Sequence, residues 1–280
     1  MTSYCKLRNK SELTRSLATS FMTKQFSSTG MVPLDGHMYP YLRTMDLSNN
    51  LLSGTVPASL FTLPALQTLC LQMNRLSGAI EEFQNPSAKL TDIDLSSNQL
   101  TGAVPTSFSY LTALQSLQLD NNNFTGTLDL NPFLRLRNLS VISASYNPLL
   151  SASGDGNEVD ASSNSSISTL FLAYCNLTRF PLAVRYLPEL QYLDLSSNQI
   201  HGEIPDWIWR NMSSLNLSHN HFTTVGQPLH YVNIRFINLS FNMLGGAVPF
   251  PFDVYDLDYS NNKFSSIPPS SFLRQFEVAY

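Results

Sequence analysis

Histidine and aspartate are the residues of this sequence that could bind a metal ion or transfer protons. His219 and His221 are separated by a single residue, Asn220, but no carboxylate or cysteine lies at metal-ligand spacing from them. Asp253, Asp256 and Asp258 form a short acidic run, yet the last two fall at outward positions of an expected strand. The sequence contains no glycine-rich phosphate loop and no nucleophile motif. We therefore expect no enzyme activity, no catalytic residue, no metal site and no cofactor.

Asparagine is the polar residue with the most regular spacing, and its amide carries two hydrogen-bond donors and an acceptor. It takes the ninth position of the pattern apolar-x-x-apolar-x-apolar-x-x-Asn-x-apolar. Copies of the pattern begin at Leu42, Leu66, Leu90, Leu114, Leu139, Ile167, Leu190, Met212, Ile234 and Val254. Their ninth positions hold Asn50, Asn74, Asn98, Asn122, Asn147, Cys175, Asn198, Asn220, Asn242 and Asn262. We expect each amide to bond buried backbone groups of its own repeat and the next, with Cys175 as a small structural substitute rather than a reactive thiol.

The repeats must be stacked, because no single copy can bury its own apolar positions. Successive copies begin 24, 24, 24, 25, 28, 23, 22, 22 and 20 residues apart. The first, fourth, sixth and eleventh positions are apolar in every copy. The fourth and sixth alternate as the inward side chains of a strand do. The pattern predicts one short strand per repeat, joined in a parallel sheet along the concave side of a solenoid.

Glycine and proline recur in the second half of the repeats. Gly54, Gly102, Gly202 and Gly246 suit backbone positions with positive φ. Pro57, Pro105, Pro205 and Pro249 stop helix propagation. This half therefore predicts an extended and 3₁₀ convex side with little α-helix. We expect Trp207 and Trp209 to pack on that side.

The segment LSSNQLTGAVP, residues 95–105, resembles the plant-specific leucine-rich repeat. The run from Leu170 to Trp209 resembles the middle of plant disease-resistance receptor-like proteins of the Verticillium-wilt-resistance type. The resemblance implies a leucine-rich repeat solenoid of the α/β-horseshoe superfamily, plant-specific subclass. It covers residues 42–268, about ten repeats with a loop insertion at 151–166. Residues 1–41 then hold a degenerate repeat, and residues 269–280 begin a further one.

The ends of the sequence lack features that this resemblance implies. Receptor-like proteins carry a signal peptide, a cap with paired cysteines, a transmembrane helix and a short cytoplasmic tail, and none is visible in these residues. We therefore expect a fragment of a longer receptor-like protein. The resemblance places that protein at the plasma membrane, with the repeats on the extracellular side.

Composition bears on the partners. The net charge is -4, and no basic cluster occurs outside the first 25 residues, which argues against nucleic acid as a partner. Asn-x-Ser/Thr sequons occur at Asn9, Asn123, Asn138, Asn164, Asn176, Asn211, Asn216 and Asn238. Their number exceeds the chance expectation and favours a secreted glycoprotein.

Outward positions of the strands are the expected ligand-binding surface. Repeats one to four carry a polar, mildly acidic row there, which includes Asp92 and Asp94. From repeat five onward large side chains replace it, and the binding candidates are Tyr146, Phe171, Tyr174, Tyr192, His219, Arg235, Phe236 and Phe241, with Tyr255 beside them. Exposed aromatic residues on neighbouring strands are typical of binding hot spots. The alternative is that some of them fold back against the 151–166 loop.

These features predict non-catalytic recognition of a peptide or protein on the concave face. By resemblance, the chain is part of the ectodomain of a cell-surface receptor-like protein in defence or development signalling. That family lacks its own kinase, so the resemblance also implies a co-receptor kinase as partner. The alternative function is a secreted inhibitor of a microbial polysaccharide-degrading enzyme. A non-functional remnant is a further alternative.

Overall fold

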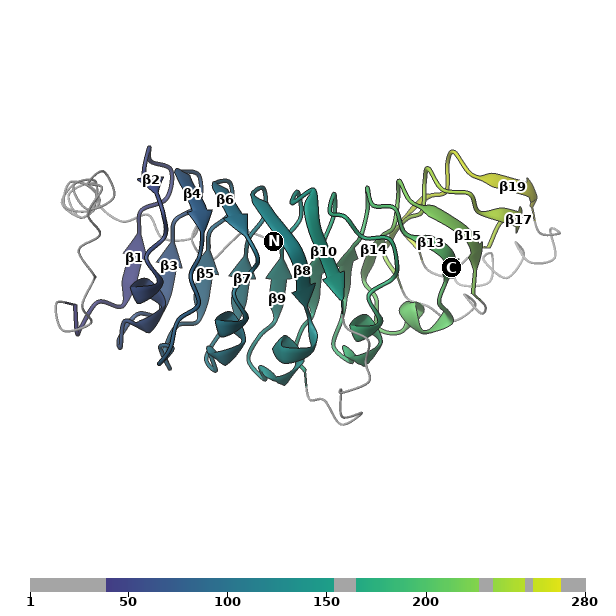
Figure 1. The fold of residues 1–280 in the computed structure, drawn as a ribbon. Helices are drawn as coiled ribbons and strands as arrows, with labels where there is room; N and C mark the ends of the chain where they lie inside the picture. Colours follow the sequence, from purple (N-terminus) through teal and green to yellow (C-terminus); the bar gives the residue numbers. More distant parts are fainter. Residues whose placement is uncertain (1–38, 154–164, 227–233, 250–253, 268–280) are drawn as a thin grey trace.

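The computed structural model describes residues 39–153, 165–226, 234–249 and 254–267. These residues form a curved solenoid built from consecutive short turns of chain (Figure 1). Its main sheet has ten parallel strands in chain order, one per repeat. They are β1 (Thr44–Asp46), β3 (Thr68–Cys70), β5 (Asp92–Asp94), β7 (Ser116–Gln118), β9 (Val141–Ser143), β11 (Thr169–Phe171), β12 (Tyr192–Asp194), β14 (Ser214–Asn216), β16 (Phe236–Asn238) and β18 (Asp256–Asp258). Residues 1–38 of the predicted segment 1–41, the whole of segment 269–280 and most of the predicted loop at 151–166 lie outside the described residues.

Equivalent positions of neighbouring repeats lie side by side in the main sheet. Ile93 of β5 pairs with Leu117 of β7, so the fourth positions form a continuous inward row. Leu95, Leu119 and Leu195, at the sixth position, are fully buried. Burying each such side chain stabilises the fold by roughly 1.5–3 kcal/mol. The predicted solenoid is confirmed.

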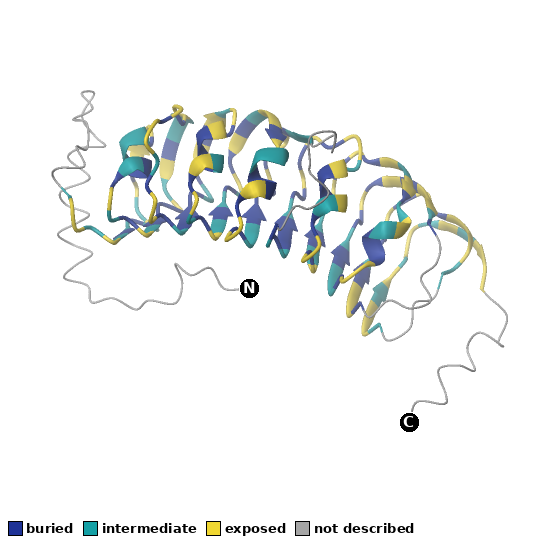
Figure 2. Cartoon of the chain, turned by 90° about the horizontal axis from the view of Figure 1, so that it is seen from below, coloured by how far each residue is buried: buried dark blue, intermediate teal, exposed yellow. Residues whose placement is uncertain are grey.

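Figure 2 shows the main sheet on the inner side of the curve and short helices on the outer side. The helices are 3₁₀ turns: η3 (Ala58–Thr62), η4 (Thr106–Tyr110), η5 (Asn131–Arg135), η6 (Leu182–Tyr186) and η7 (Asp206–Trp209). Prolines precede four of them, as Pro105 precedes η4, because the start of a helix does not need the N–H that proline lacks. The described residues contain no α-helix, as the sequence predicted. No helix in the described part has the length and apolar character to span a membrane.

The core lies between the main sheet and the outer turns. Phe61, Phe83 and Phe108 fill it in the first half, with ring centroids 5.0, 5.0 and 5.8 Å apart. Toward the other end the core becomes thinner, and Leu257 and Phe264 are only partly buried. The packing of each repeat therefore depends on its neighbours, as in other solenoids.

A second set of parallel strands, which the sequence analysis did not predict, runs along one flank. β2 (Ser53–Gly54), β4 (Arg75–Ala79), β6 (Gln99–Gly102), β8 (Asn123–Asp129) and β10 (Leu149–Ser153) form one flanking sheet, and β13 (His201–Ile204) with β15 (His221–Val225) and β17 (Gly245–Ala247) with β19 (Lys263–Ser266) form two smaller ones. The four predicted glycines have φ between 77° and 98°. A Cβ at Gly102 would lie 2.9 Å from that of Ala79, so this flank requires glycine for close approach as well.

The asparagine side chains tie each repeat to the one before it. Asn98 donates to the carbonyl oxygens of Leu95, 3.1 Å away in its own repeat, and Leu71, 3.0 Å away in the preceding one. Its Oδ1 accepts from the Leu76 amide at 3.0 Å. The prediction that the amide reaches the next repeat is wrong, because the open backbone groups within its reach belong to the preceding turn. The same backward bonds are made by Asn74, Asn122, Asn147, Asn198, Asn220, Asn242 and Asn262, whereas the bonds described for Asn50 stay within its own repeat.

Cys175 interrupts this ladder. Its Sγ donates to the Ala144 carbonyl at 3.3 Å, but it has no oxygen to accept the amide of the preceding repeat. That amide, on Leu150, instead donates to the Asn147 carbonyl at 2.9 Å. Leu150 is buried and Leu149, the predicted apolar position, is 61% exposed. The prediction for the eleventh position of repeat five is therefore wrong by one residue, and Cys175 is structural, as expected.

Candidate functional site on the concave face

A column of left-handed residues runs along the edge of the main sheet, one in each repeat directly before the ladder residue. Its members have φ between 51° and 59°: Asn49, Met73, Ser97, Asn121, Tyr146, Tyr174, Ser197, His219, Phe241 and Asn261. Four of the predicted binding residues lie in this turn column rather than on the strands. The prediction placed them on the strands; it is wrong for these four because the strands end three residues earlier.

The turn column holds two pairs of facing rings. Tyr146 and Tyr174 have centroids 5.8 Å apart with planes at 33°. His219 and Phe241 have centroids 4.2 Å apart with planes at 10°, a stacked arrangement. Ser197 occupies the repeat between the two pairs. We call Tyr146–Tyr174 and His219–Phe241 the ring pairs.

The rings of these pairs are exposed. Tyr146 is 58% accessible, Tyr174 is 51% and Phe241 is 46%. A left-handed backbone costs an ordinary L-residue about 1–2 kcal/mol, and asparagine tolerates it best. Several repeats have asparagine in the turn column, so the large rings stand where a smaller residue would be less strained. Strain without compensating burial is a reason to look for a binding role.

The remaining candidates lie on or beside the strands. Phe171 on β11 and Tyr192 on β12 are half-buried and lie diagonally across neighbouring strands, because Tyr192 pairs with Thr169 and Phe171 pairs with Asp194. Phe236 on β16 and the preceding Arg235 are exposed. The structure thus brings the eight candidates to one surface, in a line that runs from repeat five to repeat nine.

The acidic row of the first repeats is less accessible than the sequence predicted. Asp92 and Asp94 are 9% and 3% exposed. Burial raises the pKa of Asp92, and the hydrogen bond from Thr91 opposes this. Burial also raises the pKa of Asp120, although the Ser143 hydroxyl donates a short hydrogen bond to its Oδ1. These carboxyl groups therefore present little exposed charge to a ligand.

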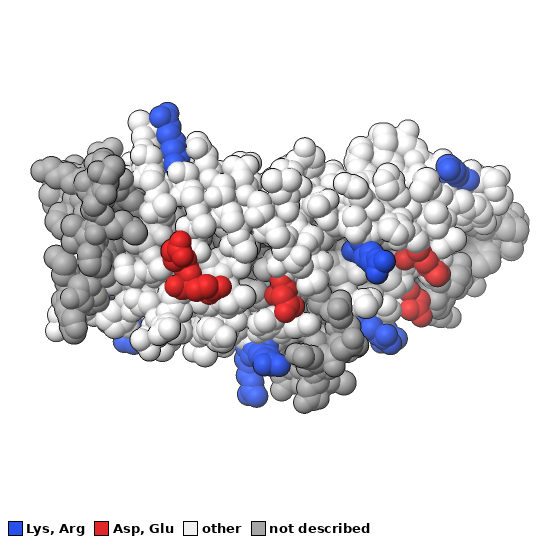
Figure 3. Space-filling model, in the orientation of Figure 1, with Lys and Arg blue, Asp and Glu red and all other residues white. Residues whose placement is uncertain are grey.

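Charged side chains are few on the face that Figure 3 shows, and several of them lie in small groups. The polar surface comes from serine, threonine and asparagine instead, in agreement with the 13% share of charged residues. The described residues contain no cluster of histidine, cysteine, aspartate and glutamate that could hold a metal ion. The geometry offers stacking and hydrogen bonding on a rigid sheet, which is chemistry for binding a ligand.

Comparison with known proteins agrees with this architecture. Sequence profiles of the leucine-rich repeat match residues 41–63, 87–149, 189–211 and 210–226. The ectodomain of the Arabidopsis thaliana receptor kinase GASSHO1/SCHENGEN3, solved with CASPARIAN STRIP INTEGRITY FACTOR 2, superposes over 83% of this chain and 29% of its own, with a TM-score of 0.70 and 28% identity. The Arabidopsis receptor kinase HAESA, solved with the peptide hormone IDA and the co-receptor SERK1, superposes over 84% of this chain and 40% of its own, with a TM-score of 0.67 and 29% identity.

These residues fold as a leucine-rich repeat solenoid. Among curated relatives, Receptor like protein 22 of Arabidopsis thaliana is 34% identical over 151 residues, which is 51% of this chain and 19% of the relative. Receptor-like protein 39 of the same plant is 36% identical over 113 residues, which is 38% of this chain and 13% of the relative. The chain thus matches less than a quarter of the length of these plant receptor-like proteins.

The sequons divide into two groups on the leucine-rich repeat scaffold. Asn123, Asn138, Asn176 and Asn211 are exposed and lie off the main sheet. Asn216 and Asn238 are half-buried at outward positions of β14 and β16, and their Oδ1 atoms accept hydrogen bonds from Ser218 and Ser240. A glycan on either of these two would cover part of the concave face. Asn9 and Asn164 lie outside the described residues.

The sequence analysis missed one large exposed residue of the turn column. Met73 is 56% exposed and lies in the turn column of repeat two. The signal was present, because Met73 directly precedes ladder residue Asn74 as Tyr146 precedes Asn147. The left-handed conformation at this position was the part that the apolar pattern did not reveal.

Proposed function

We propose that this leucine-rich repeat chain recognises a peptide or protein ligand as part of the ectodomain of a plant cell-surface receptor-like protein. The single observation that supports this most is the pair of exposed ring contacts held in strained turns on the concave edge. Aromatic side chains with few rotatable bonds are favourable anchors, because little side-chain entropy is lost on binding. Of the solved leucine-rich repeat ectodomains described above, that of HAESA is in complex with a peptide hormone, which supports the same mode.

In this mechanism the ligand lies along the main sheet and contacts the ring pairs in turn. The half-buried Phe171 and Tyr192 form an apolar floor beside the first pair. Arg235 and Phe236 extend the surface next to the second pair. The chain performs no reaction, and a receptor kinase partner carries the signal in defence or development.

The test begins with peptides selected from a displayed library against the purified chain. Tyr146→Asn combined with Tyr174→Asn removes one ring pair and leaves a residue that the left-handed backbone accepts. We expect at least a tenfold loss of affinity with an unchanged melting temperature, since hot-spot residues each contribute about 2 kcal/mol or more. The control is Tyr110→Asn, because Tyr110 is 63% exposed but lies on η4, on the outer side.

Equal affinity of the double variant and the parent would remove the ring pairs from the binding surface. The kinase partner is tested separately, by asking whether a receptor kinase co-purifies with the full gene product from plant tissue. If the full gene product instead inhibits a polysaccharide-degrading enzyme, the alternative function as a secreted inhibitor is favoured. The proposal would be contradicted if the double variant kept its affinity for the peptides and no receptor kinase co-purified with the gene product.

A further inference from the structure

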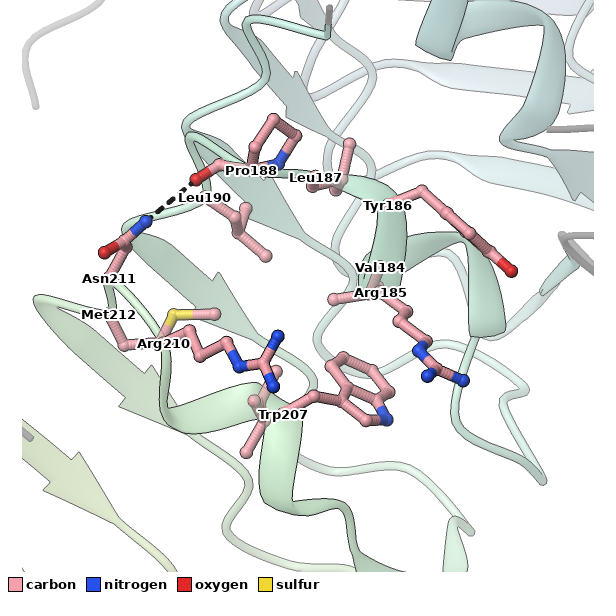
Figure 4. A pocket seen from close by; sticks show the side chains of 11 residues that line it. Val184, Arg185, Tyr186, Leu187, Pro188, Leu190, Trp207, Arg210, Asn211 and Met212 are labelled. Carbon is pink, nitrogen blue, oxygen red and sulfur yellow. Dashed lines mark hydrogen bonds between the residues drawn. The ribbon is translucent and has the colours of Figure 1, made fainter. Parts of the chain in front are cut away.

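A pocket on the outer side of the solenoid lies between repeats six and seven. Its cavity has a volume of about 350 Å³, within the range of small-ligand sites. Figure 4 shows side chains from η6 and the turn after it on one side and from η7 and the turn after it on the other. The concave sheet and its ring pairs take no part in it.

The sequence explains why the pocket opens here. From Pro181 to the first position of the next repeat, Leu190, the chain takes nine residues, but from Pro205 to Met212 it takes seven. The shorter outer segment leaves part of its neighbour uncovered. In addition, the third residue after the proline is Phe108 in repeat three but Val184 in repeat six, and the smaller side chain leaves volume unfilled.

The lining combines an apolar floor with positive charge. Val184, Leu190 and Met212 are each 3% exposed or less and form the floor. Arg185 and Arg210 are the charged residues of the lining, and both are exposed cations. Neither has an ion-pair partner among the described residues. In Figure 4 the Arg210 guanidinium points over this floor, whereas that of Arg185 lies on the other side of the Trp207 indole. A guanidinium group over an apolar floor is complementary to an anion that carries an apolar body.

An aromatic wall adds shape to the pocket. The indole of Trp207 is held by an edge-to-face contact with Phe180, with centroids 5.3 Å apart and planes at 89°. Figure 4 shows the Arg210 guanidinium beside this indole. At the rim, Asn211 Nδ2 donates to the Pro188 carbonyl at 3.1 Å, which fixes the turn there. A flat ring can therefore enter between a fixed indole and the floor.

We propose that this outer pocket binds a small aromatic acid, with the ring on the apolar floor and the carboxylate at Arg210. The site is separate from the concave surface and does not depend on the function proposed for it. The carboxylate would accept charge-assisted hydrogen bonds from the Arg210 guanidinium. Ring burial would supply the apolar part of the affinity.

The experiment titrates the purified chain with phenylacetate and, as the neutral comparison, with phenylacetamide. We expect phenylacetate to bind more tightly, and Arg210→Gln to weaken its binding by about tenfold. Arg135→Gln is the matched control, since Arg135 is an exposed arginine at the end of η5 that does not line the pocket. Its affinity should equal that of the parent.

A second variant tests the cavity itself. Val184→Phe introduces the residue that repeat three has at this position and should abolish phenylacetate binding without lowering the urea midpoint. If Val184→Phe fails to fold, the exposed Arg210 still tests the site through Arg210→Gln. Equal binding of phenylacetamide, equal competition by inorganic sulfate, or full binding by Val184→Phe would each overturn the proposal. If a peptide with a C-terminal phenylalanine binds tenfold more tightly than phenylacetate, the ligand is the C-terminus of a peptide and the proposal is overturned.

The concave variants separate this site from the proposed receptor function. Tyr146→Asn with Tyr174→Asn should leave phenylacetate binding unchanged. Conversely, Val184→Phe should not change the affinity for the peptides that were selected from the displayed library. Loss of one activity without the other shows which of the two proposals has failed.

Discussion

The imidazole of His219 lies flat on the ring of Phe241, with centroids 4.2 Å apart and planes 10° from parallel. Both residues are left-handed, and they belong to successive repeats. The contact therefore depends on the stacking distance of the solenoid and on two strained turns. Neither residue contributes to the core, so their substitution tests binding apart from folding.

Phe241→Asn should change the free energy of unfolding by less than about 1 kcal/mol, because the loss of ring stacking is offset by relief of the left-handed backbone. Urea unfolding measures this change. The matched control is Phe222→Ala, since Phe222 is fully buried. That variant should lose about 3–5 kcal/mol. Similar losses in the two variants would show that Phe241 serves the fold and not the surface.

Asn98→Ala should destabilise the protein by about 3 kcal/mol, because it leaves buried backbone groups without partners. The effect should be directional. Hydrogen exchange at the Leu76 amide, which donates to Asn98, should rise, while the Leu100 amide, which donates to Asn122, stays protected. Gln99→Ala, at an exposed neighbouring position, is the control. Equal loss of protection at both amides would contradict the backward direction of the ladder.

The Cys175 thiol should make stability fall in alkaline solution. Burial raises its pKa from 9.0 to about 11. Because the folded state holds the proton more tightly, the contribution is present in full below pH 9 and is lost as the pH rises toward 11. Between these values the parent should lose up to about 2 kcal/mol more than Cys175→Ala. Parallel pH profiles of the two proteins would refute this.

Glu82→Gln should destabilise the protein by less than about 1 kcal/mol, since the carboxylate is exposed. Glu82 accepts hydrogen bonds from the Thr106 and Ser107 amides at 2.7 and 2.8 Å, where η4 begins. Although partial burial opposes it, these bonds hold the pKa of Glu82 below its ordinary value. Its contribution is therefore present above that ordinary value and is lost as the pH falls through the lowered pKa. Glu81→Gln, which removes an exposed neighbouring charge, is the control.

The apolar pattern alone predicted the main sheet, because positions such as Leu95 and Leu119 have to be buried wherever the repeats stack. It failed at Leu149, where Leu150 is buried instead and its amide donates to the Asn147 carbonyl rather than to a side chain of the next repeat. An apolar pattern contains no information about a hydrogen-bond partner in the next turn of chain. The neighbouring Leu150 was equally apolar, so the sequence could not decide between them.

The candidate site was predicted less completely than the fold. The sequence identified Tyr146 and Phe241 as outward residues, but the left-handed turn that faces the rings toward each other follows from backbone geometry. The outer pocket was missed altogether. It results from a two-residue difference between outer segments together with Val184 in place of a larger residue, and such a volume defect appears only after packing.

The flanking strands stop at β10 and resume at β13, so repeat six has main-sheet pairing but no strand on the flank. The ladder is also weakest there, at Cys175. We expect the solenoid to flex at this joint more readily than elsewhere, with two stiffer arms on either side. Tyr146 belongs to one arm and the His219–Phe241 pair to the other. Flexing at this joint would change the distance between Tyr146 and the His219–Phe241 pair, so that the same solenoid would bind ligands of slightly different length.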